Sequence, residues 1–402
     1  MNKIRDFSGG YPRQFWLLFG GMLISAAGGS MVWPFLTIYI RQRFNTPLTT
    51  VGLALSLNST VGLVTTFVAG PIVDRFGRKG VMALSLFVSS VVFAAMIPAD
   101  TLLLWVLLMI ISGAFNPLFR VGSDAMVADL IAPDRRSSAY ALLRMSNNVG
   151  VAIGPAVGGF IAAVSYTWAF SIAAVANLAF TLLILLFVSE TLPQAGSESA
   201  RLSTAGGYGH LLHDRPFLAF CGLSALAVIP SSLMMVLLPV YAKEQFGVGE
   251  SQYGFIMTTN AAMVVLFQYL VTRITKRLPP LPVLAAGALF YALGAGSVAW
   301  GQSFAAFLSS MVVLTIGEMA LVPTATTLTA NLSPPDMRGR YMGFYGLTWG
   351  LGFGIGPMLG GMLNDHLAPV AIWYGGLAIG LTAALGFLLL ARLLRQPVYQ
   401  SE

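Results

Sequence analysis

Apolar runs of full or nearly full membrane-spanning length follow one another along the whole chain. Gln14–Tyr39, Thr101–Val121 and Leu377–Ala391 are examples, and about twenty residues at a rise of ~1.5 Å cross the ~30 Å hydrocarbon core of a bilayer. Charged residues make up only 9% of the 402 positions, whereas a soluble chain carries about a quarter. So little charge cannot cover a water-exposed surface, and the sequence predicts an integral membrane protein.

We expect an all-α fold with twelve transmembrane helices in two pseudo-symmetric six-helix bundles around a central cavity. The first apolar run is long enough to span the membrane and continues into Trp33 and Pro34, so it should remain as a helix and not be removed as a signal peptide. The expected helices are 13–40, 47–72, 79–98, 101–131, 137–165, 167–189, 216–242, 250–274, 280–301, 303–332, 338–367 and 369–394.

The basic residues are distributed asymmetrically between the connections. With the N-terminus in the cytoplasm, 17 of the 22 Lys and Arg residues lie in the cytoplasmic connections and termini, and only Arg41, Arg43 and Lys243 lie on the opposite side. The positive-inside rule therefore predicts that both termini are cytoplasmic. The net charge of +7 is then explained by anionic lipid headgroups and not by nucleic acid. We expect a multi-pass protein of a bacterial cytoplasmic membrane.

A long polar connection divides the chain into halves. Residues 190–215 are rich in Ser, Gly and charge, which predicts a flexible cytoplasmic linker between a bundle at 1–189 and a bundle at 216–402. A shift of 202 residues aligns the halves, pairing Asn58 with Asn260 and Arg75 with Arg277, among others. A constant offset over this length indicates a parallel duplication, which is a transporter architecture with substrate bound near the midplane.

The connection between the second and third expected helices carries a motif, Gly70-Pro-Ile-Val-Asp-Arg-Phe-Gly-Arg-Lys79. We expect Gly70 and the following proline to end the helix. Together with the twelve spans and the duplication, the motif resembles the loop signature of the major facilitator superfamily. The resemblance implies that Asp74 latches the cytoplasmic ends of the halves near Met337–Tyr341. The expected gating residues are Gly70, Asp74, Arg75, Gly77 and Arg78.

Helices 5 and 11 both contain glycines spaced four apart beside a proline. Small residues at this spacing allow close helix approach. The order also resembles the antiporter motif of the drug:proton branch of the superfamily, which favours efflux over uptake, although the second copy leaves a general packing role open. The motif residues are Gly154, Pro155, Gly158, Gly356, Pro357 and Gly360.

Four charged residues lie inside expected spans, namely Arg120, Asp124, Arg144 and Glu318. A charge at this depth costs ~2.5–3.5 kcal/mol or more and is usually functional. Glu318 and Asp124 are the candidates for proton coupling. Glu318 could instead be a permanently protonated or hydrogen-bonded structural residue, and Asp124 could form a fixed ion pair with either arginine.

Polar and aromatic positions on the expected helices give a candidate substrate cavity, although such residues also serve in helix packing. The candidates are Arg120, Arg144, Asn148, Asn260, Gln268, Tyr345 and Trp349. The main hypothesis is proton-coupled efflux of amphipathic or cationic drugs by alternating access. Transport of one defined metabolite (a sugar, an organic anion or an amino-acid derivative) and a non-transporting receptor are the alternatives.

Two positions depart from the drug:proton pattern. Met109 stands where that branch has an Arg in helix 4, and helix 1 has no carboxylate beside Pro34. The sequence also lacks a cluster of nucleophiles, bases or metal ligands, and its single cysteine, Cys221, cannot form an internal disulfide. We therefore expect no enzyme activity, no cofactor and no metal. The expected partners are a small-molecule substrate, protons and the lipid bilayer, with a monomer implied by the resemblance.

Overall fold

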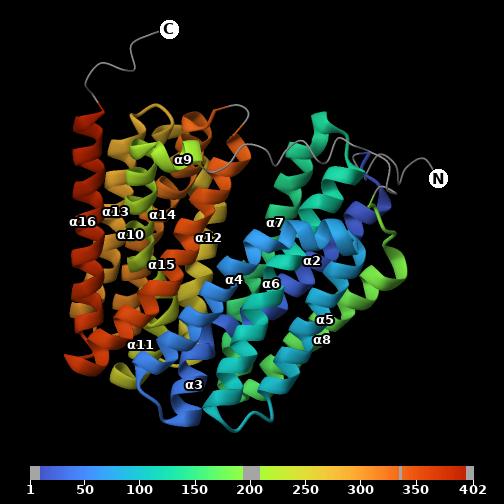
Figure 1. Cartoon of the computed structure of the whole chain (residues 1–402). Helices are drawn as coiled ribbons and strands as arrows, with labels where there is room; N and C mark the ends of the chain where they lie inside the picture. Colours follow the sequence, from blue (N-terminus) through green and yellow to red (C-terminus); the bar gives the residue numbers. More distant parts are fainter. Residues whose placement is uncertain (1–9, 193–208, 335–336, 395–402) are drawn as a thin grey trace. The chain divides into compact units, whose positions relative to one another are not determined.

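The computed structural model describes residues 10–192, 209–334 and 337–394, and these residues form helices joined by short connections, with no strand among them (Figure 1). The first half begins with α2 (Arg13–Val32), a short 3-10 turn (Trp33–Phe35) and α3 (Leu36–Phe44), which together make one long span. It continues with α4 (Leu48–Phe76), α5 (Arg78–Met96), α6 (Leu102–Leu130), α7 (Pro133–Val164) and α8 (Tyr166–Phe187).

The second half begins with a short helix, α9 (Gly209–His213), inside the connection expected to be a flexible linker. It continues with α10 (Arg215–Val236), α11 (Leu238–Phe246), α12 (Glu250–Thr275), α13 (Pro280–Ser297) with a 3-10 turn (Val298–Trp300), α14 (Phe304–Leu332), α15 (Arg338–His366) and α16 (Ala371–Leu393).

The prediction of an all-α membrane fold is confirmed. Eleven of the described helical segments are long and apolar enough to cross a bilayer. The eleventh expected span, α15, is the one not among these; it has 29 residues and is long enough, but its many glycines and its basic start lower its mean hydropathy. The seventh expected helix is interrupted at Leu237, just after the end of α10, and resumes as α11, which reaches Phe246.

One expected helix end was wrong. The Gly70-Pro71 pair does not end the second span, because α4 runs on to Phe76 with Pro71 inside it. Membrane helices tolerate an internal proline when neighbouring groups satisfy the freed carbonyl. The chain turns instead at Gly77, whose φ of 91° lies in the region that only glycine adopts readily.

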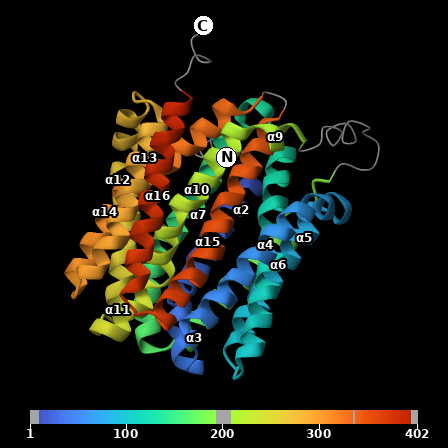
Figure 2. The same ribbon diagram turned by 60° about the vertical axis from the view of Figure 1, so that its left-hand side comes forward.

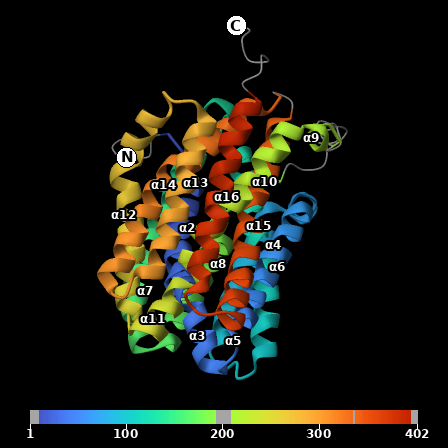
Figure 3. The ribbon, with the colours of Figure 1, turned by 90° about the vertical axis from the view of Figure 1, so that its left-hand side faces the viewer.

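The helices divide into two compact units. Unit 1 contains Met1–Tyr39 and Leu57–Ser197, and unit 2 contains Ile40–Ser56 and Glu198–Glu402. In unit 1, α2 packs against α7 and α8, and α5 packs against α6 and α8. In unit 2, α10 packs against α15 and α16, and α13 packs against α14 and α16, as the turned views in Figure 2 and Figure 3 show. The same pairs of repeat-related helices are therefore in contact in both units.

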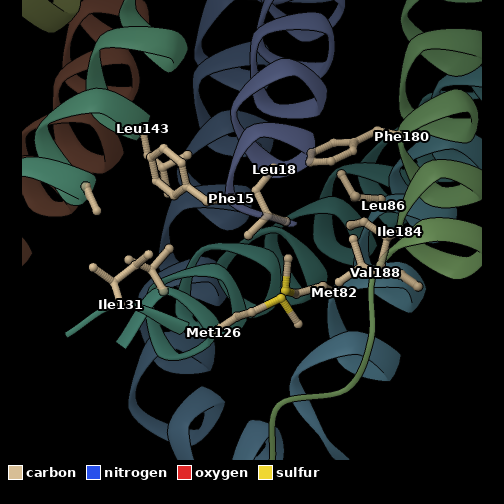
Figure 4. Packing of buried hydrophobic residues seen from close by; sticks show 13 residues of the cluster. Phe15, Leu18, Met82, Leu86, Met126, Ile131, Leu143, Phe180, Ile184 and Val188 are labelled. Carbon is tan, nitrogen blue, oxygen red and sulfur yellow. The ribbon is translucent and has the colours of Figure 1, made fainter. Parts of the chain in front are cut away.

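Unit 1 encloses a hydrophobic core to which five helices contribute. Leu18 of α2 points toward Met82 of α5 and Met126 of α6, and Phe15 of α2 points toward Leu143 of α7 (Figure 4). All five side chains are almost completely buried, and burying a side chain of this size is worth ~1.5–3 kcal/mol. This core fixes the helices that carry the charged residues of the first half.

Individual hydrogen bonds also follow the repeat. Ser30 Oγ donates to the carbonyl of Gly150 at 3.2 Å, and Ser232 Oγ donates to the carbonyl of Gly352 at 3.0 Å. Ser232 and Gly352 lie at the repeat offset of 202 residues from Ser30 and Gly150. The two halves thus join their first and fifth spans in the same way.

Candidate functional site

The carboxylate of Glu318 lies in the middle of α14 within unit 2 and is partly buried. Asn260 of α12 donates from Nδ2 to Glu318 Oε2 at 2.7 Å and also to Thr315 Oγ1 at 3.0 Å. Thr315 in turn donates to the carbonyl of Met311 at 2.7 Å. This chain of bonds holds the carboxylate toward α12. The structure therefore brings together Glu318 and Asn260, which were expected separately as a proton-coupling residue and a cavity residue.

Two further side chains of this cluster were missed by the sequence analysis. Tyr291 of α13 and Ser231 of α10 are 0% and 1% exposed. The hydroxyls of these two residues interact with each other, and the charge of Glu318 acts on Tyr291, whose ring lies against α14 at Gly317. Neither residue is charged, and nothing in the local sequence distinguishes it from a packing residue. We call the five residues Ser231, Asn260, Tyr291, Thr315 and Glu318 the Glu318 cluster.

A second group of polar side chains lies on unit 1. Arg120 and Asp124 are exposed on α6, and Arg144 and Asn148 are exposed on α7. The hydroxyl of Tyr140, one turn before Arg144, donates to the carbonyl of Asp124 at 2.9 Å. The polar surfaces of α6 and α7 therefore adjoin.

The two arginines do not form ion pairs in this unit. In the described part of the chain, no carboxylate oxygen lies within 4.0 Å of a nitrogen of Arg120 or Arg144. Arg120 does act on Asp124 through its charge from one turn away. Asp124 is thus exposed on the surface of its unit beside a cation, and among the described residues it has no direct salt bridge.

The remaining expected cavity residues make contacts inside unit 2. Gln268 donates from Nε2 to the carbonyl of Met319 at 3.0 Å and to Thr272 Oγ1 at 2.9 Å. Tyr345 is buried and stacks on Phe220, with ring centroids 5.8 Å apart. Trp349 stacks on Phe353 along α15.

The loop motif is organised by Arg78, Asp129 and Glu190. Arg78 Nε lies 3.0 Å from Asp129 Oδ2, and Arg78 Nη2 lies 3.4 Å from Asp74 Oδ1. Asp74 is largely exposed, and Arg78 is its ion-pair partner within the described residues. Arg75 lies over the ring of Phe76, 5.4 Å from its centroid, and the space around Gly70 is open.

Glu190, which the sequence analysis did not select, caps the helix that follows the motif. Its carboxylate accepts the backbone N–H groups of Arg78 and Lys79, each at 3.0 Å, at the start of α5. A Cβ on Gly77 would lie 2.5 Å from Glu190 Oε2, so glycine is required for contact as well as for conformation. Partial burial raises the pKa of Glu190, but the bonds from four backbone N–H groups lower the pKa by more, so that it lies below its ordinary value.

The two glycine motifs join helices within each unit. A Cβ on Gly154 would lie 1.8 Å from Ser30 Oγ, and one on Gly158 would lie 2.4 Å from the carbonyl oxygen of Met31. In unit 2, a Cβ on Gly356 would lie 2.0 Å from Ser232 Oγ, and one on Gly360 would lie 2.4 Å from Leu237 Cδ1. Pro155 and Pro357 lie inside the same helices, α7 and α15.

Several curated proteins are similar to this chain over most of their length. An uncharacterized MFS-type transporter of Bacillus subtilis, YqjV, is 28% identical over 373 residues, which cover 92% of this chain and 87% of the relative. A Na(+), Li(+), K(+)/H(+) antiporter of Planococcus maritimus is 25% identical, with 86% of each chain covered. The multidrug resistance protein MdtH of Escherichia coli is 25% identical, with 82% of this chain and 81% of the relative covered.

The fold is also found in solved transporters. A POT family transporter solved in complex with a thioalcohol-conjugated peptide superimposes with a TM-score of 0.80 at 16% identity, and covers 96% of this chain and 98% of its own. The family model described as Major Facilitator Superfamily matches residues 18–248 and 220–402. The chain is therefore a multi-pass membrane transporter that belongs to the major facilitator superfamily.

Proposed function

We propose that this protein is a secondary transporter that expels amphipathic or cationic compounds in exchange for protons, and that Glu318 is the residue that takes up and releases the proton. The observation that carries the proposal is the environment of Glu318. Its hydrogen-bond donor is the neutral amide of Asn260. Within the described residues no Lys, Arg or His nitrogen lies within 4.0 Å of the Glu318 carboxylate. A carboxylate at membrane depth without a basic partner is neutralised at least cost by a proton or by a cationic substrate.

The relatives support exchange against protons and the export of drugs. One is named as an antiporter that uses protons and another as a multidrug resistance protein. The glycine motif of α7 favours the same direction of transport. We further propose that Asp74 forms a cytoplasmic latch, that both termini are cytoplasmic, and that the chain works as a monomer in a bacterial inner membrane with the predicted domain boundaries.

Dye efflux in everted membrane vesicles tests the proposal. Energised vesicles containing the native chain should move a cationic dye, and a protonophore should stop this movement. Glu318→Gln should remove the protonophore-sensitive part. Glu244→Gln is the matched control, because Glu244 forms a partly exposed ion pair with Arg41, and such pairs contribute only ~0–1 kcal/mol. Protonophore-sensitive efflux that persists in Glu318→Gln would contradict the proposal.

A second candidate function is transport of one organic anion. Arg120 and Arg144 are exposed on adjoining helices and make no ion pair in the described part of the chain, and guanidinium groups bind carboxylates and phosphates well. This candidate predicts that Arg144→Gln abolishes uptake or export of a carboxylate substrate while cationic dyes are not moved by the native chain.

A further inference from the structure

A cavity of about 170 Å³ lies in unit 2, where α12 ends, α13 begins and α14 approaches its end. α14 packs against both of the other helices. The lining of the cavity includes Thr272, Lys276, Pro280, Thr324 and Asn331, and we call it the Lys276 cavity. Sites for drug-sized ligands have volumes of ~300–1,000 Å³, so this cavity fits a small chemical group and not a whole drug molecule.

Three of the lining side chains carry hydrogen-bond donors that have no acceptor. Lys276, Thr324 and Asn331 make no hydrogen bond and no ion pair in the part of the chain that the structure describes. Thr327 also lines the cavity, but its hydroxyl already donates to the carbonyl of Pro323 at 2.8 Å. Ammonium, amide and hydroxyl donors gathered around one cavity are groups that bind an anion.

The charge around the cavity also favours an anion. No Asp or Glu is among the described residues that line it, and Arg273 and Arg277 flank Lys276 in the sequence. α13 begins at Pro280 without a side-chain cap, so the positive end of its dipole lies at the cavity. The ends of α12 and α14 oppose this, but each carries only about half a negative charge against three full cations.

An apolar stripe on α12 leads to the cavity. Leu266, Leu270 and Ile274 follow one another at a spacing of four residues, and each is more than half exposed. This spacing places them on one face of the helix over about 12 Å. Leu278, in the turn that follows, is also exposed and lines the cavity. The polar cavity therefore continues into an apolar surface that suits an acyl chain, which a free phosphate ion would not use.

We propose that the Lys276 cavity binds the phosphate group of an anionic phospholipid, with an acyl chain along the stripe of α12. Lys276, Thr324 and Asn331 donate to the phosphate oxygens. Arg273 and Arg277 attract the net negative charge of the headgroup, as basic residues near an anionic bilayer surface do. A choline lipid has the same phosphate but no net charge, because its own cation lies beside these arginines. This site does not involve Glu318 or the proposed exchange of protons.

Thermal unfolding with added lipid tests the site. The full-length protein in a non-ionic detergent is titrated with phosphatidylglycerol, phosphatidylcholine, glycerophosphoglycerol or inorganic phosphate at equal concentration and ionic strength. A ligand of the folded protein raises the unfolding temperature as its concentration exceeds Kd. Phosphatidylglycerol should raise this temperature, whereas the choline lipid and the two anions without acyl chains should have little effect.

Substitutions locate the binding to the cavity. Lys276→Gln should need about fivefold more phosphatidylglycerol for the same rise. Arg277→Gln is its matched control, because it removes the same charge from the next residue, which does not line the cavity. Thr324→Val should also weaken the response, whereas Thr326→Val should not, because Thr326 lies outside the lining and its hydroxyl donates to the carbonyl of Val322.

Four results would overturn the site. Equal stabilisation by the glycerol and choline lipids would show that the headgroup charge is not recognised. Equal stabilisation by inorganic phosphate would show a site for the free ion and not for a lipid. Equal losses in Lys276→Gln and Arg277→Gln would show a diffuse attraction to the surface. Equal responses of Thr324→Val and Thr326→Val would exclude the cavity even if Lys276→Gln fails to fold.

Discussion

Asn260 on α12 donates a 2.7 Å hydrogen bond to the carboxylate of Glu318 on α14, and the first half of the chain has no equivalent of this pair. At the repeat positions, Asn58 donates at 2.7 Å to the carbonyl of Met109, and Asn116 stands where the second half has Glu318. The asparagine of the duplicated unit has therefore kept its place between two helices. Only in the second half does it support an ionisable group, so the duplication became chemically asymmetric at this position.

We predict that replacing glycine by alanine destabilises unit 1 only where α7 packs closely on α2. Gly158→Ala would place a Cβ 2.4 Å from a backbone oxygen of Met31, which cannot rotate away, whereas Gly20 on α2 has open space around it. Gly158→Ala should destabilise unit 1 by ~1–3 kcal/mol. Gly20→Ala should be neutral or stabilising, because alanine is the better helix former. Thermal unfolding of both variants checks this, and equal unfolding temperatures would contradict the packing.

We predict that the effects of substituting Gln268 and Pro323 on stability are coupled, because Gln268 bonds the carbonyl of Met319. Proline has no N–H, so Pro323 leaves the carbonyl of Met319 without its helical donor, and Gln268 Nε2 supplies one at 3.0 Å. Gln268→Ala should therefore cost ~1–3 kcal/mol. In a Pro323→Ala background the helical N–H returns, and the cost should shrink. A double-mutant cycle on unfolding measures the difference, and additive effects would contradict the prediction that Gln268 replaces the missing helical donor.

We predict that the stability of the first turn of α4 depends on Asp365, near the end of α15. Its carboxylate accepts the N–H of Leu48 at 3.2 Å and the N–H and hydroxyl of Thr49, each at 2.7 Å, within unit 2. Asp365→Ala removes the cap and should cost ~0.5–2 kcal/mol. Hydrogen exchange should accelerate at the first turn of α4. Asn364→Ala removes a single donor to Asp365 and should have a smaller effect, so an equal effect would contradict the capping role.

We predict that the cap from Glu190 stabilises the folded protein to an extent that depends on pH. Its pKa in the folded protein is lowered by backbone N–H donors, against the opposing effect of burial. A lowered pKa means that the stabilisation is complete above the unfolded value, about 4.3, and is lost as the pH falls through the folded value. Glu190→Gln should lower the unfolding temperature at pH 7. Because the side chain is exposed, the effect should be at the low end of ~0.5–2 kcal/mol. Unfolding temperatures of the native chain and the variant should converge in acid, and a constant difference would contradict the prediction.

The spans were predictable because lipid imposes one rule on every segment. Backbone groups in hydrocarbon must be bonded within the segment, so length and apolarity identify a helix wherever it packs. The Gly70-Pro71 prediction failed for the same reason, since neighbouring groups in a membrane bundle compensate a proline that would end a helix in water. The turn is set by Gly77, and its requirement for glycine comes both from its positive φ and from contact with Glu190, more than a hundred residues away.

The candidate site was only partly predictable. Glu318 was identifiable because a carboxylate inside a span is rare. Tyr291 is an ordinary residue for such a helix, and only the close approach of α13 to α14 at Gly317 shows that its ring lies against the helix that carries the carboxylate. Asp365 and Glu190 lie near helix ends, where charged residues are common. Their roles depend on which helix start lies opposite them, and this is a property of the packed bundle.

Transport driven by an imposed pH gradient in proteoliposomes tests the role of Glu318 most directly. For the native chain, a proton gradient should drive uphill movement of a cationic dye, and reversal of the gradient should reverse the movement. In Glu318→Gln, gradient-driven accumulation of the dye should fall by about tenfold or more, equivalent to ~1.4 kcal/mol or more of lost coupling. The variant should still exchange labelled for unlabelled dye without a gradient. Gradient-driven accumulation in Glu318→Gln equal to that of the native chain would contradict the account.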